Sequence, residues 1–204
     1  MKKIEVKICG LTRLEDALAA QEMGADYLGF ILAKQSKRFI DEEHLAALTA
    51  QLPEKAFRVG VFVDETEAEI RRLAVRCRLD VIQLHGSEPP ELAEALYRDF
   101  PVWKAVAVSG RTNIDEVVDY PCDRLLLDGD KQSGEPCNWS IAQDITRRRE
   151  AFLAGGLDCG NVLKAIRLVK PCGVDVAGGV ELAAGIKDHQ KIREFLRIIR
   201  TRKK

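Results

Sequence analysis

Short apolar runs alternate with amphipathic stretches along almost the whole chain, and this alternation constrains the fold more than any other feature. Eight of the runs are short enough to be buried strands: 4–8, 27–32, 58–63, 81–85, 102–108, 125–128, 151–154 and 173–176. Apolar side chains at helical spacing follow each of them. Because a helix between two strands carries the chain back to the same edge, successive strands pair in parallel. The sequence therefore predicts eight β-then-α units.

Eight such units can close into a barrel. The chain has 204 residues, which leaves roughly 25 residues per unit, a length that suits a strand and a helix joined by short loops. A doubly wound open sheet is the alternative, but it usually uses fewer units. We therefore expect an α/β fold, a single (β/α)8 TIM barrel, with residues 1–204 forming one domain. No linker or low-complexity run divides the sequence.

Capping residues stand before five of the helical stretches. Two sites read T-x-x-E, a capping box in which the hydroxyl and the carboxylate satisfy backbone N–H groups of the first turn. These two boxes are Thr12 with Glu15 and Thr66 with Glu69. The single capping side chains expected before the other three helices are Asp41, Ser87 and Asp158.

Charge and cysteine content exclude several function classes. Thirty-two basic residues balance 32 acidic ones, which argues against nucleic acid or an anionic membrane as the main partner. No apolar run approaches the roughly 18 residues that a membrane span needs. The six cysteines form no C-x-x-C pair and no zinc-finger spacing with histidine. With a polar N-terminus and no secretory segment, these features predict no disulfide framework and a cytoplasmic setting.

The first expected strand ends in a candidate catalytic thiol. In barrels of this kind the active site lies at the C-terminal ends of the strands, where Cys9 stands. Lys7 is two residues earlier and should point to the same side of the strand. Its positive charge would favour a partly ionised thiol. The alternative is that Cys9 is only a small apolar residue that closes the strand.

Other strand ends carry further polar candidates. Asp128 follows three leucines, and a carboxyl group at the edge of an apolar interior is suited to donate a proton, although it could also brace a loop. Arg38 follows the second strand, and its planar fork matches a carboxylate, although it could be a solvated loop charge. With three histidines and no carboxylate cluster, a metal site is not expected. Lys7, His85 and Asp175 are candidate substrate contacts instead.

Two glycine pairs follow the last two expected strands. Gly155 and Gly156 come after the seventh strand, and Gly178 and Gly179 after the eighth. Glycine lets backbone N–H groups approach an anion closely, and this rim is where barrel enzymes often bind phosphate. The plain alternative is that the glycines only make turns. Two pairs at these strands favour a phosphate site.

Taken in order, seven groups of residues resemble the phosphoribosylanthranilate isomerase family. They cover nearly the whole chain and comprise KICGLT (7–12), GF (29–30) with SKR (36–38), RVGVFV (58–63), QLHG (83–86), LLD (126–128), AGGL (154–157), and VDV (174–176) with GVE (179–181). Each group alone is modest evidence for the family, whereas the whole set in this order is highly specific for it.

The resemblance implies an aldose–ketose isomerase of tryptophan biosynthesis. Such an enzyme converts N-(5-phosphoribosyl)anthranilate, a phosphosugar, by an Amadori rearrangement that needs no cofactor. By position, Asp128 would be the general acid and Cys9 the general base. Arg38 would hold the anthranilate carboxylate, and the backbone around Gly156 and residues 178–179 the phosphate. The family includes monomers and dimers, so a monomer or a homodimer is expected.

Two segments depart from the family pattern. Residues 129–139 lack most of the usual glycines, and residues 177–181 read AGGVE where SSGVE is usual, which removes two hydroxyl groups but keeps the backbone donors. One alternative is thus a phosphosugar-binding barrel without activity. Another is a related aminoaldose isomerase of histidine biosynthesis. That chemistry is expected to use aspartates at both catalytic positions, so Cys9 argues against it.

Overall fold

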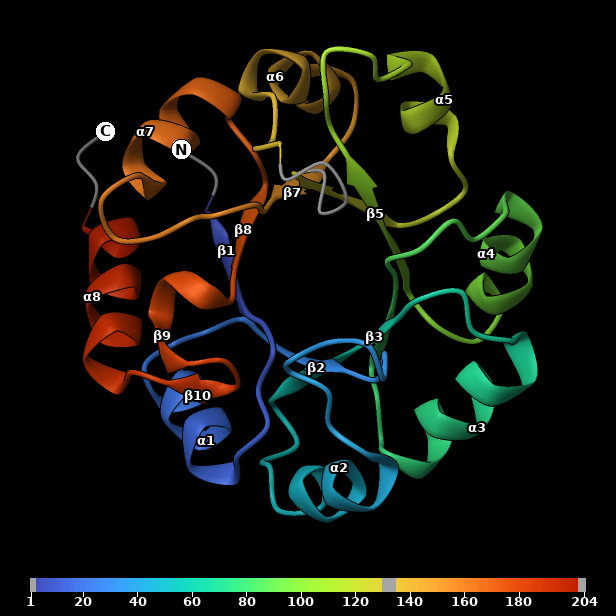
Figure 1. The fold of residues 1–204 in the computed structure, drawn as a ribbon, viewed down its shortest axis with the longest axis vertical. Coiled ribbons are helices and arrows are strands. Elements are labelled where there is room, and N and C mark those ends of the chain that lie inside the picture. The colour runs from blue at the N-terminus through green and yellow to red at the C-terminus, as the bar shows by residue number, and fades with distance from the viewer. Residues whose placement is uncertain (1–2, 130–134, 202–204) are drawn as a thin grey trace.

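Eight strands and eight helices alternate around a central barrel, shown end-on in Figure 1. The computed structural model describes residues 3–129 and 135–201. The barrel strands are β1 (Glu5–Ile8), β2 (Tyr27–Ile31), β3 (Phe57–Phe62), β4 (Val81–Leu84), β5 (Val102–Ala107), β6 (Arg124–Asp128), β7 (Ala151–Leu153) and β8 (Gly173–Val176). The helices are α1 (Leu14–Glu22), α2 (Glu42–Thr49), α3 (Glu67–Arg76), α4 (Pro90–Tyr97), α5 (Ile114–Asp119), α6 (Trp139–Arg148), α7 (Val162–Val169) and α8 (His189–Arg200).

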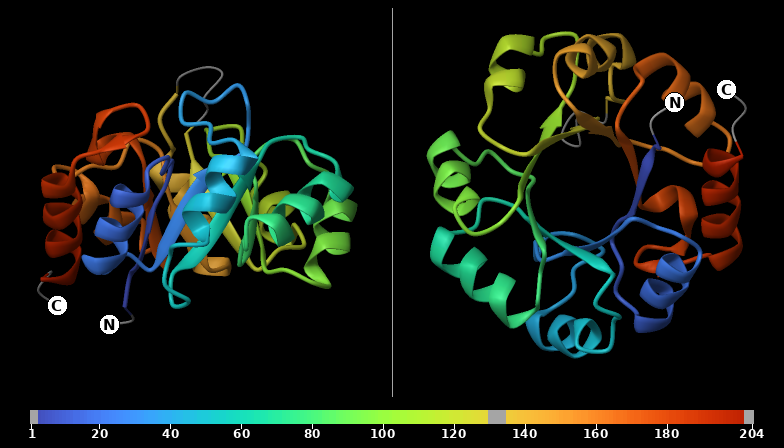
Figure 2. Two further views of the ribbon diagram at one scale, coloured as in Figure 1. Left: turned by 90° about the horizontal axis from the view of Figure 1, so that it is seen from below. Right: turned by 180° about the vertical axis from the view of Figure 1, so that it is seen from behind.

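The strands follow one another around the barrel in chain order, and the predicted (β/α)8 barrel is confirmed. Every neighbouring pair is parallel, and β8 closes the ring against β1 with Lys7 opposite Asp175. Figure 2 shows the long connecting loops at one rim, whereas β1 begins and α8 ends at the other. At that second rim Arg200 links the end of α8 to the start of β1, because its Nη1 donates to the carbonyl of Ile4 at 2.6 Å.

The connection from β8 to α8 contains structure that the alternation did not predict. A 3-10 turn, η1 (Gly178–Val180), leads into a small antiparallel sheet of β9 (Glu181–Ala183) and β10 (Ile186–Lys187). Strands of three and two residues are too short to show a period in the sequence. The sheet lies against α1, where the backbone N–H of Lys187 donates to the Asp16 carboxylate at 3.0 Å.

Two of the five predicted caps are confirmed. The Asp41 side chain accepts from the backbone N–H of His44 at 3.0 Å, at the start of α2. The Thr66 hydroxyl accepts from the backbone N–H of Glu69 at 3.3 Å, at the start of α3. Both side chains satisfy a donor that the helix itself leaves unpaired. The second half of the Thr66 capping box is wrong, because the backbone N–H of Thr66 donates to the Glu65 carboxylate at 2.8 Å instead of to that of Glu69.

The other three predicted caps are wrong. Helix α1 has Arg13 at its N-cap, and the Thr12 hydroxyl instead donates to the carbonyl of Gly185 in the β9–β10 connection, at 2.7 Å. Helix α4 begins at Pro90 rather than after Ser87, because residues that precede a proline avoid the helical region. Asp158 accepts from two N–H groups of the turn before α7 but does not cap that helix.

Removing a confirmed cap should destabilise the protein measurably. In Thr66→Ala the N–H of Glu69 loses its acceptor, and we expect the free energy of unfolding to fall by about 1 kcal/mol. Urea denaturation followed by circular dichroism would measure this loss. Thr66→Ser keeps the hydroxyl and serves as the matched control. A loss in Thr66→Ser as large as in Thr66→Ala would show that the hydroxyl is not the stabilising group.

Aromatic side chains fill the barrel near the N-terminal ends of its strands. The ring centroid of Trp103 lies 4.8 Å from that of Tyr27 and 4.7 Å from that of Phe152. The Arg124 guanidinium lies 5.6 Å from the Trp103 and Phe152 rings. A Cβ at Gly173 would meet the Phe152 ring at 2.4 Å, so this layer is tightly packed. The functional cavity therefore lies at the opposite end.

Candidate active site

A cavity of about 780 Å³ opens at the C-terminal ends of the strands. Nine of the ten predicted site residues line it: Cys9, Arg38, His85, Asp128, Gly155, Gly156, Asp175, Gly178 and Gly179. The tenth, Lys7, is fully buried behind this lining. Its ammonium is therefore placed to act on its neighbours rather than to line the cavity.

Lys7 links the candidate base to a carboxylate on the next strand. Its Nζ lies 3.1 Å from Oδ1 of Asp175, its register partner on β8. Lys7 and Cys9 point to the same side of β1, as expected, because both face Gly29 on β2. Burial disfavours the charged amine, but Asp175 and Cys9 outweigh it and raise the pKa of Lys7. Lys7 therefore carries a positive charge.

Burial controls the ionisation of the thiol. It raises the pKa of Cys9, while the positive charges of Lys7 and Lys187 act in the opposite direction without cancelling it. Asp175 raises the pKa of Cys9 further. At neutral pH the thiol is mostly protonated, in contrast to the partly ionised thiol that the neighbouring lysine suggested.

Gly29 on β2 makes room for this pair. A Cβ at this position would lie 2.9 Å from Sγ of Cys9 and 2.9 Å from Cε of Lys7. Any larger residue would displace both side chains. A glycine inside a strand often marks such a close approach.

The candidate acid, Asp128, lies beside an ordered histidine. Nε2 of His85 is 3.4 Å from Oδ2 of Asp128, and Oδ1 accepts from the backbone N–H of Gly129 at 2.7 Å. The amide nitrogen of Gln83 lies 2.9 Å from Nδ1 of His85. This contact holds the imidazole ring so that Nε2 faces Asp128. His85 thus orients the carboxyl group.

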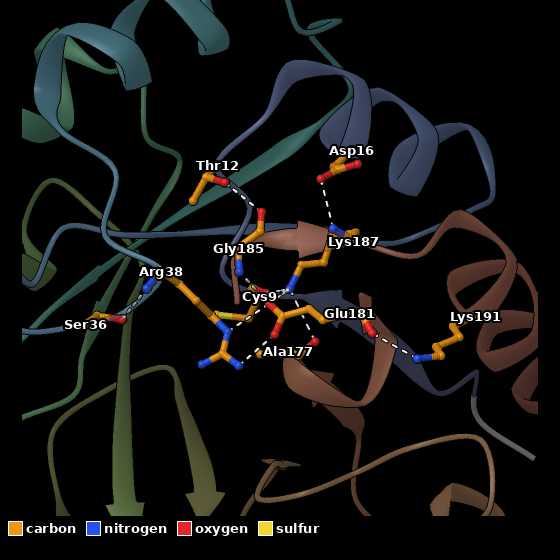
Figure 3. Close-up of polar contacts among 10 residues, drawn as sticks. All are labelled: Cys9, Thr12, Asp16, Ser36, Arg38, Ala177, Glu181, Gly185, Lys187 and Lys191. Atoms are coloured by element: carbon orange, nitrogen blue, oxygen red, sulfur yellow. Dashed lines mark hydrogen bonds and ion pairs between the residues drawn. The ribbon is translucent and has the colours of Figure 1, made fainter. Parts of the chain in front are cut away.

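Arg38 forms a bidentate ion pair that was not predicted (Figure 3). Its Nε and Nη2 donate to the two oxygens of Glu181 at 2.8 and 2.7 Å. Burial acts to raise the pKa of Glu181, but Arg38 and Lys187 outweigh it and lower that pKa to about 2. The carboxylate is therefore ionised at neutral pH.

Two glycines define the path of the Arg38 side chain. A Cβ at Gly10 would meet Cδ of Arg38 at 2.5 Å, and Gly10 has a φ of +73°, which disfavours other residues. A Cβ at Gly178 would lie 3.2 Å from Nη2 of Arg38. The stem therefore crosses Gly10, and the guanidinium lies against the η1 turn.

The four predicted phosphate-site glycines have different surroundings. A Cβ at Gly155 would lie 2.9 Å from Oδ1 of Asp128, so this glycine packs against the candidate acid. At Gly179 a Cβ would lie only 2.0 Å from the carbonyl oxygen of Leu157, so the two loops could not approach. Gly156 adopts a φ of +70° with open space beside it. Gly156 and Gly178 are both exposed, so their backbones are accessible to a ligand.

Residues 3–129 and 135–201 contain neither a cluster of metal ligands nor a membrane-spanning helix. No three histidine, cysteine, aspartate or glutamate side chains there lie close enough to hold a metal ion. The helices in these two ranges are too short or too polar to cross a membrane. Of the divergent segment 129–139, residues 130–134 lie outside the described part of the chain.

The chain matches known proteins along almost its whole length. Residues 6–197 match the family model described as N-(5'-phosphoribosyl)anthranilate (PRA) isomerase. A relative of that name from Geobacter sulfurreducens is 44% identical over 199 residues, which is 95% of this chain and 97% of the relative.

Two solved structures are also similar. The phosphoribosyl anthranilate isomerase of Thermus thermophilus superposes with a TM-score of 0.91 at 43% identity, covering 97% of this chain and 99% of its own. Another phosphoribosyl anthranilate isomerase was solved with reduced 1-(o-carboxyphenylamino)-1-deoxyribulose 5-phosphate. It has a TM-score of 0.88 at 40% identity and covers 97% of this chain and 98% of its own. The resemblance inferred from the motifs is confirmed, and the chain belongs to the N-(5'-phosphoribosyl)anthranilate isomerase family.

Proposed function

We propose that this chain converts N-(5-phosphoribosyl)anthranilate into 1-(2-carboxyphenylamino)-1-deoxyribulose 5-phosphate. The supporting observation is that one cavity contains a thiol, a carboxyl group and an arginine from separate strand ends: Cys9, Asp128 and Arg38. The Amadori rearrangement needs one group that donates a proton and another that removes one. A protein that only binds a phosphosugar has no need of such a pair.

Asp128 begins the reaction as the general acid. It donates its proton to the furanose ring oxygen, and the bond between that oxygen and C1 breaks. The lone pair of the anthranilate nitrogen forms the new C=N bond, which gives a protonated Schiff base. His85, 3.4 Å from the carboxyl group, keeps it directed to the ring oxygen.

Cys9 completes the reaction as the general base. Its thiolate removes the proton from C2, and the electron pair of that C–H bond forms the C1=C2 bond of an enolamine. The C=N electrons return to the nitrogen. Proton transfer from the C2 hydroxyl to C1 then gives the ketone. Lys7 and Lys187 stabilise the thiolate form, because both positive charges lower the pKa of Cys9 against the effect of burial.

The two anionic ends of the substrate are bound at different places on the rim. Arg38 binds the anthranilate carboxylate, and the backbone near Gly156, Gly178 and Gly179 binds the phosphate. Asp175 completes the cavity wall and holds Lys7 behind Cys9. Binding at both ends places the reacting carbons between acid and base.

A direct assay tests this function. Freshly generated phosphoribosylanthranilate is mixed with the protein, and the decay of anthranilate fluorescence is followed. Decay well above the uncatalysed background supports the isomerase. Reduced 1-(o-carboxyphenylamino)-1-deoxyribulose 5-phosphate serves as a reduced product analogue. A folded protein that binds this analogue without accelerating the decay would instead be a phosphosugar-binding barrel.

We also propose a cytoplasmic location. All six cysteines are free thiols, as expected in a reducing compartment. The single domain over residues 1–204 and the monomeric or homodimeric state stay predictions. Sedimentation velocity over a range of protein concentrations would decide between monomer and dimer.

A further inference from the structure

Glu181 joins two cations, Lys187 and the cavity-lining Arg38 (Figure 3). Besides its two bonds to Arg38, its Oε1 accepts from Nζ of Lys187 at 2.7 Å. Glu181 is only 8% exposed and Lys187 only 2% exposed. Burying these two charged groups is costly unless each is paired and hydrogen-bonded, so the geometry of the cluster that they form with the partly exposed Arg38 is tightly specified.

Lys187 uses all of its donors within the protein. Its ammonium donates to the carbonyl of Cys9 at 2.6 Å, to the carbonyl of Ala177 at 3.3 Å and to Glu181. An ammonium group has three N–H donors. Lys187 therefore ties the ends of β1 and β8 to Glu181 and has no donor left for a substrate.

The cluster has more positive than negative charge. Arg38 and Lys187 contribute two cations, and Glu181 contributes one carboxylate. An arginine paired with a carboxylate alone would be neutral and would attract a second carboxylate weakly. Lys187 offsets the charge of Glu181, which leaves the charge of Arg38 effective toward the cavity. Glu181 occupies Nε and Nη2 of Arg38 but not Nη1.

We propose that Glu181 and Lys187 are positioning residues for the anthranilate carboxylate of the substrate. Glu181 fixes the plane of the Arg38 guanidinium, and Lys187 offsets the charge of Glu181, so that the cluster of these three residues keeps one net positive charge. Toward this carboxylate both act through Arg38, and neither touches the reacting atoms. This inference rests on the proposed function, in which Arg38 binds that carboxylate.

Glu181→Gln is the first test. The amide cannot accept two bonds from the Arg38 fork, so the guanidinium loses its fixed plane. The substitution also removes a negative charge, which by itself would favour an anionic ligand, but we expect the loss of the fixed plane to outweigh this gain. KM, and the Kd of the reduced product analogue, should therefore rise about 10- to 100-fold, whereas kcat changes much less. Inhibition by inorganic phosphate should be unchanged, because the phosphate end is held by backbone groups. A general collapse of the η1 turn would weaken both ends.

Lys187→Met is the second test and leaves Glu181 paired with Arg38. We expect the Kd of the analogue to rise about tenfold through the lost charge. Lys191→Met is the matched control. Nζ of Lys191 donates to the backbone carbonyl of Glu181 at 2.9 Å, outside the carboxylate cluster (Figure 3). This control should leave the Kd of the analogue unchanged.

A double-mutant cycle decides whether the effect passes through Arg38. In an Arg38→Ala background, Glu181→Gln should no longer alter the Kd of the analogue. Fully additive effects, or in Glu181→Gln a fall in kcat with both affinities intact, would overturn the proposal. If the wild-type protein binds the analogue but does not isomerise the substrate, the proposed function fails. In that case the Kd values of the variants for the analogue still test whether Glu181 and Lys187 position Arg38.

Discussion

Cys9→Ala should lose most of its turnover and keep its fold. Removing the thiol removes the group that takes the C2 proton, and a positioned base typically contributes about 10²- to 10⁴-fold. We therefore expect kcat to fall by about that factor, with little change in the affinity for the reduced product analogue. Stopped-flow fluorescence of anthranilate measures the turnover, and the thermal unfolding midpoint reports the fold.

The pH dependence of the wild type gives an independent check on Cys9. Because burial raises the pKa of Cys9, only a small share of the thiol is ionised near neutral pH. We expect kcat/KM to rise with pH at pH values below the pKa of Cys9, where the thiolate is the minor form. Cys159→Ala is the control, since Cys159 lies outside the cavity lining. An unchanged kcat in Cys9→Ala would exclude the thiol as the base.

Asp128→Asn should be equally damaging, for a different chemical reason. The amide fills the same space but cannot donate a proton as an acid to the ring oxygen, so ring opening becomes rate-limiting. The expected fall in kcat is about 10²- to 10⁴-fold, the usual contribution of one general acid. Single-turnover fluorescence decay measures this loss.

Asp144→Asn is the matched control for the acid. Asp144 is a partly exposed residue of α6, paired with Arg147 and outside the cavity. The same substitution there should leave kcat and KM unchanged. If Asp128→Asn kept its turnover, the proton would have to come from another group, and the assigned role of Asp128 would be wrong.

The barrel could be predicted from the sequence because its signal is local and repeated. Each strand is an apolar run of a few residues, and each helix shows its own period, so errors at single boundaries do not alter the count. The side of β1 shared by Lys7 and Cys9 follows from the same two-residue period. The rim positions of Asp128 and the glycines then follow from the fold.

The polar network at the mouth could not be predicted, because it joins residues far apart in the chain. Arg38 and Glu181 are 143 residues apart, and the Lys187 ammonium reaches the carbonyl of Cys9 across 178 residues. Glu181 belonged to a motif that resembled the family, whereas Lys187 lay in no motif. The missed cap at Thr12 has the same cause, because its hydroxyl bonds to a distant carbonyl. Local sequence patterns do not indicate hydrogen-bond partners that lie far away in the chain.

Three aromatic rings close the barrel at the N-terminal ends of its strands: those of Tyr27, Trp103 and Phe152. They fill its interior below the cavity, so a ligand bound against Cys9 has no passage through the floor. Substrate and product must then use the same opening of the cavity, and one cannot enter while the other is leaving. Accumulated product therefore competes with substrate for free enzyme, and the departure of each product molecule sets the earliest moment at which the next turnover begins.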